Sequence, residues 1–107
     1  MLYELRTYSA MPGRLPDLHK RFSEITMGYF KKYGIQVVGF WTNEIADPTI
    51  SSFTSWRTSL ADREKKWGAF LADQERVAKF AETEKNGPLV RRLTAHILRP
   101  TPYSPMQ

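Results

Sequence analysis

Hydrophobic and polar residues alternate over the first segment of the chain, Leu2–Ser9. This period of two is typical of a strand with one buried side. Because Tyr3 and Leu5 are its large apolar members, we expect their side to pack on helices. The opposite side carries the polar members, which are Glu4, Arg6 and Tyr8.

The repeat becomes helical after the turn residues Pro12 and Gly13. Apolar residues then recur every three or four positions, which places them on one stripe of a helix. Pro16 suits the first turn of such a helix, and Gly34 suits the left-handed cap at its end. We therefore expect a helix from about Leu15, with this buried stripe: Leu15, Leu18, Phe22, Ile25, Tyr29, Phe30 and Tyr33.

β-branched and aromatic residues dominate the next two segments, Gln36–Ala46 and Ile50–Arg57. The dipeptide Asp47-Pro48 supplies a turn between them, so we predict a hairpin. Another alternating segment, Val90–Arg99, predicts the last strand.

A second helical repeat begins at Leu60, where Ser59 and Asp62 approximate a capping box. Asp73 can cap a new segment within this repeat, so we expect two short helices. The apolar residues at helical spacing predict a buried side that contains Trp67, Phe70 and Leu71.

The resulting order, β-α-β-β-α-β, is that of the ferredoxin-like α+β fold, here one domain over residues 1–107. Its helices cover one face of a four-stranded antiparallel sheet. The other face is bare in a monomer, so we expect a homodimer in which two sheets form a dimeric α/β barrel. The proline-rich tail, residues 100–107, is expected to run along the outside.

The composition is that of a folded globular domain, with 41% hydrophobic and 25% charged residues. Since the chain has no cysteine and only two distant histidines, it offers no metal-ligand spacing, and we expect neither metal nor tightly held cofactor. We find no signal peptide and no apolar run of about 20 residues, which favours a cytoplasmic protein without a membrane partner. The net charge of +5 is dispersed and accompanies no recognition motif, so we expect no nucleic-acid partner.

Three islands of sequence resemble the NIPSNAP family in order and spacing. They are Tyr3–Tyr8 with Pro12-Gly13, Ser59–Arg63, and Ile97–Pro100 with Pro102–Pro105. The resemblance implies the dimeric α/β barrel fold, in agreement with the periodicity. It implies no catalytic motif, because the family has no generally established reaction.

The polar side of the first strand holds the strongest candidates for a ligand site inside the barrel. Arg6 can anchor a carboxylate or carbonyl oxygen, Glu4 can act as a base or orienting group, and Tyr8 can donate a hydrogen bond. The alternative is a buried structural network in which Glu4 and Arg6 neutralise each other.

Three further residues complete the candidate set. His96 lies on the last strand, which this fold places beside the first, so it can join Glu4 and Arg6 or serve as a structural hydrogen-bonding group. Trp41 and Asn43 alternate on the second strand and can face the cavity, although filling the core is the favoured role of Trp41.

Two classes of function fit these residues. One is a cofactor-independent enzyme that acts on a small hydrophobic or carbonyl-containing molecule in the barrel cavity, and the other is a non-catalytic ligand-binding or protein-interaction module. A walled polar pocket with a perturbed pKa favours catalysis, whereas side chains packed solid favour interaction.

Overall fold

The computed structural model describes residues 1–56 and 60–107. The strands are β1 (Leu2–Ala10), β2 (Gln36–Thr42), β3 (Thr49–Trp56) and β4 (Val90–Leu98). The helices are α1 (Leu15–Arg21), the π-helical turn η1 (Phe22–Thr26), α2 (Met27–Lys32), α3 (Leu60–Ala72) and α4 (Gln74–Thr83). This order confirms the predicted α+β fold. Two predicted features, the strand end at Arg57 and the cap at Ser59, lie outside the described residues.

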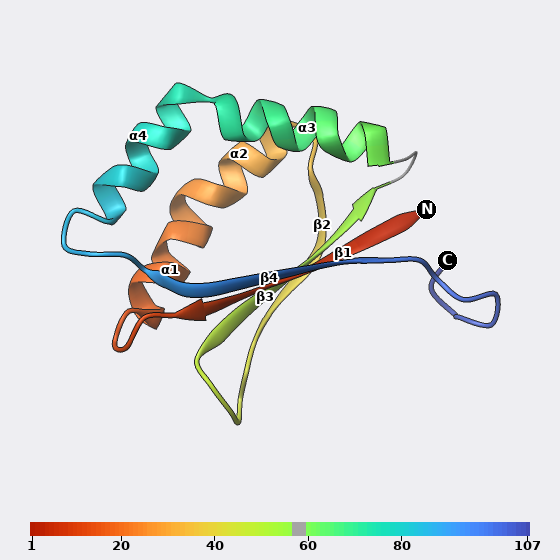
Figure 1. Ribbon diagram of the computed structural model, residues 1–107, viewed down its shortest axis with the longest axis horizontal. Coiled ribbons are helices and arrows are strands. Elements are labelled where there is room, and N and C mark those ends of the chain that lie inside the picture. Colours follow the sequence, from red (N-terminus) through yellow and green to blue (C-terminus); the bar gives the residue numbers. More distant parts are fainter. Residues whose placement is uncertain (57–59) are drawn as a thin grey trace.

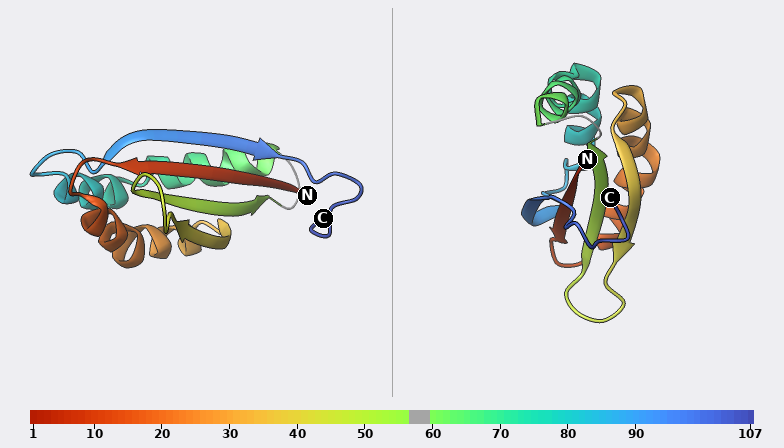
Figure 2. Two further views of the ribbon diagram at one scale, coloured as in Figure 1. Left: turned by 90° about the horizontal axis from the view of Figure 1, so that it is seen from below. Right: turned by 90° about the vertical axis from the view of Figure 1, so that its right-hand side faces the viewer.

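The strands form one antiparallel sheet in the order β2-β3-β1-β4, which is the ferredoxin-like arrangement. All described helices lie on one face of this sheet, as Figures 1 and 2 show. The opposite face is hereafter the helix-free face. Leu93 and Ile97 of β4 lie on the helix-covered face, because their partners on β1 face the helices. Their side chains are nevertheless 44% and 42% exposed, so the helices cover β4 only partly.

β2 is shorter than predicted and ends at Thr42 instead of Ala46. The Asn43 side chain donates a hydrogen bond to the backbone oxygen of Asp47, at 2.8 Å, and so closes the connection to β3. Ala46 has a φ of 117°, which a strand does not accommodate. Asn43 therefore belongs to the turn and does not face a cavity on the sheet, contrary to the prediction.

The first predicted helix begins at Leu15, but a π-helical turn divides it. The Met27 amide donates to the carbonyl oxygen of Phe22, five residues back. Gly34 has a φ of 69°, consistent with the predicted left-handed cap. The apolar stripe packs between the helices and the sheet. Leu18, Phe22, Tyr29 and Phe30 are buried there, whereas Leu15, Ile25 and Tyr33 are partly buried.

Asp73 separates α3 from α4, as predicted, because its side chain accepts a hydrogen bond from the Arg76 amide at 3.0 Å. In α3, Phe70 is buried and Trp67 stacks on it, with ring centres 5.0 Å apart. Leu71 is 50% exposed, so its predicted place in the core is wrong.

The interior consists of two apolar clusters between the sheet and the helices. One is built on Leu18, Ile50 and Leu89, and the other on Phe30 and Trp56. The tail after β4 folds back toward the start of β1 (Figure 1). No helix in the described part of the chain is long and apolar enough to span a bilayer.

Candidate functional site

β1 turns its polar side toward the helices. Glu4 is fully buried, the Tyr8 ring meets the Phe22 ring of η1 with centres 5.0 Å apart, and the Arg6 guanidinium lies 4.5 Å from the centre of a Trp67 ring on α3. The prediction that Glu4, Arg6 and Tyr8 face the interior of a barrel is therefore wrong. They lie inside the monomer, between its sheet and its helices.

The helix-free face carries two of the other candidates, His96 and Trp41. Leu5 lies opposite Phe53 on β3 and His96 on β4, so His96 is on the face away from Glu4 and Arg6 and does not join them. The Trp41 ring meets the Phe53 ring edge-on, with centres 6.4 Å apart. Since Trp41 is 56% exposed, the favoured prediction that it fills the core is also wrong.

The Glu4 carboxylate accepts four hydrogen bonds from described residues. Its Oε1 accepts from Trp56 Nε1 at 3.2 Å and from Arg63 Nε at 2.7 Å. Its Oε2 accepts from Arg6 Nη1 and Arg63 Nη2, both at 3.1 Å. These four donors use the hydrogen-bonding capacity of a carboxylate, which offers about four lone-pair positions.

The electrostatics of this cluster oppose a role for Glu4 in proton transfer. Burial raises the pKa of Glu4, but hydrogen bonds and charge from Arg63 and Arg6 together outweigh it and hold the pKa below its ordinary value. A general base at neutral pH needs a pKa nearer to 7 and an open lone pair. The geometry thus favours the structural alternative for Glu4 and Arg6.

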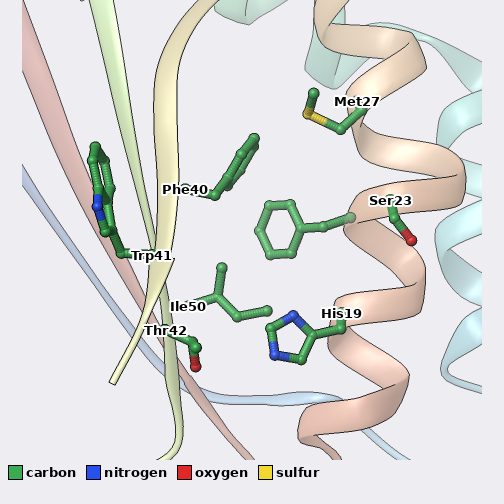
Figure 3. A pocket seen from close by; sticks show the side chains of 8 residues that line it. His19, Ser23, Met27, Phe40, Trp41, Thr42 and Ile50 are labelled. Atoms are coloured by element: carbon green, nitrogen blue, oxygen red, sulfur yellow. The ribbon is translucent and has the colours of Figure 1, made fainter. Parts of the chain in front are cut away.

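A pocket of about 320 Å³ lies between the first helical region and the edge strand β2 (Figure 3). Its largest walls are apolar, and they come from Phe22, Met27, Phe40 and Ile50. Trp41 also borders it, but the Trp41 ring lies on the far side of β2. We call this space the β2 pocket.

Three polar residues line the β2 pocket. The Thr42 hydroxyl donates to the backbone oxygen of Thr49 at 2.8 Å, and the Ser23 hydroxyl donates to that of Lys20 at 3.2 Å, so both protons are engaged. His19 points its ring into the pocket (Figure 3). Neither ring nitrogen of His19 forms a hydrogen bond within residues 1–56 and 60–107, and a neutral imidazole has one N–H to donate.

A second, smaller cavity of about 130 Å³ lies between β1 and helices α3 and α4. Arg6 and Tyr8 border it, and Arg6 Nε donates to the Tyr8 hydroxyl at 2.9 Å. Among the described residues, no group of three or more His, Asp or Glu side chains is placed to hold a metal ion.

Sequence reasoning missed His19 and Arg63 as site residues. His19 lies off the apolar stripe, and its contribution to the β2 pocket depends on where β2 packs against the helix. Arg63 lies in one of the islands that resemble the NIPSNAP family, and that resemblance was the available signal.

Comparisons with known proteins agree with this architecture. A NIPSNAP family protein from Agrobacterium tumefaciens has 26% sequence identity and a TM-score of 0.84, over 100% of this chain and 94% of that one. A NIPSNAP domain protein from Burkholderia xenovorans has 21% identity and a TM-score of 0.83, over 98% and 99% of the two chains. No curated protein matches the chain.

The fold extends to more distant structures. A monooxygenase of Streptomyces coelicolor, in complex with nanaomycin D, has 13% identity and a TM-score of 0.61, over 94% of this chain and 87% of that one. The family model named NIPSNAP matches residues 3–105. Because this match covers nearly the whole sequence and includes all three islands, the chain belongs to the NIPSNAP family.

Proposed function

We propose that the protein binds a small hydrophobic molecule that carries a carbonyl oxygen, and that it does so in the β2 pocket. The observation behind the proposal is an apolar pocket with one uncommitted hydrogen-bond donor, His19. Ligand sites are typically concave spaces of about 300–1,000 Å³ with apolar walls and a few polar groups. The β2 pocket, at about 320 Å³, meets that description.

The polar groups of the pocket limit the chemistry of the ligand. Because the protons of Thr42 and Ser23 are engaged, an acceptor on the ligand finds its donor at His19. A carbonyl oxygen is such an acceptor, and the rest of the ligand packs against the rings of Phe22 and Phe40.

Of the two classes of function considered, ligand binding has the stronger support. Catalysis in the barrel depended on Glu4 and Arg6. These residues bind each other inside the monomer, where Glu4 also binds Arg63. The Streptomyces monooxygenase with nanaomycin D supports the view that this fold can hold an organic ligand.

Binding of 2-acetylnaphthalene, compared with 2-ethylnaphthalene, tests the proposal. We expect the ketone to shift the methyl resonances of Met27 and Ile50 in a saturable way. His19→Leu should weaken ketone binding about tenfold while binding of the hydrocarbon changes little, as for one lost hydrogen bond of about 1.5 kcal/mol. Met27→Trp should obstruct the pocket to both compounds.

Lys31→Trp on the same helical region is the control, because Lys31 is exposed and outside the pocket. Absence of saturable shifts in the unmodified protein, or equal binding by the Met27→Trp and Lys31→Trp variants, would overturn the proposal.

We further propose that a second copy of the chain covers the helix-free face, which gives the homodimer expected from the sequence. The described positions that register places on this face include one formally charged residue, Arg92, although 25% of the chain is charged. The helix-free face also exposes the large apolar side chains of Trp41 and Leu98. A surface depleted in charge and rich in aromatic residues is typical of the core of an interface.

Light scattering tests the dimer. We expect twice the chain mass of 12.4 kDa for the unmodified protein and a shift toward the monomer for Trp41→Glu, which puts a charge into the interface. Val77→Glu, on the outer side of α4, should leave the mass unchanged. A monomer mass for the unmodified protein at micromolar concentration contradicts the proposal.

A further inference from the structure

The smaller cavity, which we call the arginine cavity, has an unusual lining. Three guanidinium groups border it, from Arg6, Arg21 and Arg76, and its described lining contains no carboxylate. The remaining walls are largely aromatic, from Tyr8, Phe22, Phe30, Trp67, Phe70 and Phe80. Arg6 and Arg21 have carboxylate partners outside the lining, Glu4 and Glu84, whereas Arg76 forms no salt bridge within the described part of the chain. A partly buried cation is stabilised by an anion, so Arg76 is the group of this lining that lacks one.

Two of these cations share one aromatic ring. The guanidinium carbons of Arg21 and Arg76 lie 4.7 Å and 4.6 Å from the ring centre of Phe80. Burial lowers the pKa of Arg76, and repulsion from the Arg21 guanidinium acts in the same direction, although the Asp73 carboxylate opposes both. An anion placed beside both groups would relieve that repulsion.

The hydrogen bonds in the described part of the chain leave donors available. Arg76 uses Nε and Nη2 to bind the backbone oxygens of Phe70 and Leu71, which leaves its Nη1 without a protein partner there. Arg6 uses Nε and Nη1 for Tyr8 and Glu4, which leaves its Nη2. Arg21 forms a salt bridge through Nη1 alone, so its Nε and Nη2 are also available.

The size of the cavity limits the ligand to about one ring. A cavity of about 150 Å³ in another protein accommodates benzene. The arginine cavity, at about 130 Å³, is smaller but opens to solvent beside Leu71, which is 50% exposed, so a ring can enter it with a substituent at the opening. Planar guanidinium groups bind carboxylates with two parallel hydrogen bonds, and aromatic walls stack on a ring. We propose that the arginine cavity is a second binding site, distinct from the β2 pocket, for a small aromatic carboxylate.

Titration with benzoate, followed by calorimetry and by NMR of the Trp67 indole, tests this site. We expect saturable binding of benzoate. At the concentrations at which benzoate saturates the site, we expect no binding of benzyl alcohol or acetate. Benzyl alcohol lacks the charge, and acetate lacks the ring. Equal binding by either compound would overturn the assignment of ligand class.

Two variants test the location. Arg76→Met should weaken benzoate binding about tenfold to a hundredfold, as for loss of charge-assisted hydrogen bonds. Leu71→Trp keeps all three arginines and fills the cavity from a position that is 50% exposed, so it tests the site even if Arg76→Met impairs folding.

Arg91→Met, at an exposed residue of β4, is the control for total charge and should bind like the unmodified protein. Met27→Trp should also leave benzoate binding intact, because Met27 borders the β2 pocket and not the arginine cavity. Benzoate binding that survives both Arg76→Met and Leu71→Trp, or its absence from the unmodified protein, would overturn the proposal.

Discussion

The two sides of β1 invert the usual relation between polarity and burial. Toward the helices, Glu4 is fully buried and Arg6 lies against the ring of Trp67. Toward the helix-free face, Leu5 is only partly covered, and Tyr3 is buried largely beside the tail and Phe53. One strand therefore buries its charges within the monomer and leaves apolar side chains for the other face.

Alternation thus gives the period of a strand but not which of its sides faces the interior. A charged residue can be the inner one when another element supplies its counter-charge, and Arg63 of α3 does so for Glu4.

Glu4→Gln should have the largest effect on stability. It removes the carboxylate shared by Arg6 and Arg63 and leaves two partly covered guanidinium groups without it. We expect a loss of about 3 kcal/mol in the free energy of unfolding, measured with urea, at the lower end of the usual range because both arginines retain some exposure. Glu64→Gln, whose side chain is 72% exposed beside the same Arg63, should change it by about 0.5 kcal/mol or less.

Arg6→Met should destabilise the protein less than Glu4→Gln. Arg63 still donates two hydrogen bonds to Glu4, so the carboxylate keeps a cationic partner. We expect a loss of about 1.5–2 kcal/mol by urea unfolding, the scale of one hydrogen bond to a charged group. Arg92→Met, on the helix-free face, is the matched variant and should have a smaller effect. Equal losses from Glu4→Gln and Arg6→Met would mean that Arg63 does not share the carboxylate.

Acid should weaken the protein partly through Glu4. The pKa of Glu4 is lower in the folded state than its ordinary value, so the folded state favours the ionised form. This contribution to stability is present above the ordinary pKa of glutamate, about 4.3, and is lost as the pH falls through the folded pKa. Urea unfolding from pH 7 down to about pH 3 should show a shallower decline for Glu4→Gln. Parallel declines would show that the pKa of Glu4 is the same in the folded and unfolded states.

Tyr3→Phe should have the smallest effect and should act on the tail. The Tyr3 hydroxyl donates to the backbone oxygen of Gln107 at 2.7 Å, and this bond holds the folded-back tail. Its loss should lower stability by about 0.5–1.5 kcal/mol. Hydrogen exchange in residues 101–107 should become faster, while exchange in α3 stays unchanged. Unaltered exchange in the tail would mean that other contacts hold it.

Sequence periodicity predicted the order of elements and the break at Asp73, and the fold that this order indicates predicted that the last strand lies beside the first. These features follow from local chemistry, such as the capping side chain of Asp73, and from the limited set of topologies for this order. The end of β2 at Thr42 was not predicted, although Asn43 is of a residue type depleted in strands, because the β-branched Ile45 extends the strand-like pattern beyond Thr42.

The candidate site was predicted less well because it depends on long-range partners. Glu4 and Arg6 were correctly identified as possible members of one network, but their side of β1 is decided by Trp56 and Arg63, more than 50 positions away in the sequence. The β2 pocket likewise depends on how β2 packs against α1 and α2. The residues around His19 in the sequence do not indicate that packing.

The π-helical turn at Phe22–Thr26 constrains the number of residues in the first helical region. Leu18, Phe22, Thr26 and Phe30 are all buried at steps of four residues, whereas an α-helix overshoots a full turn by about 40° in each such step. The wider turn offsets part of this drift. Deleting one residue there would restore a regular helix and rotate α2 by about 100° relative to α1, which would carry Phe30 away from the sheet. Insertions and deletions should therefore be rarer in this segment than substitutions.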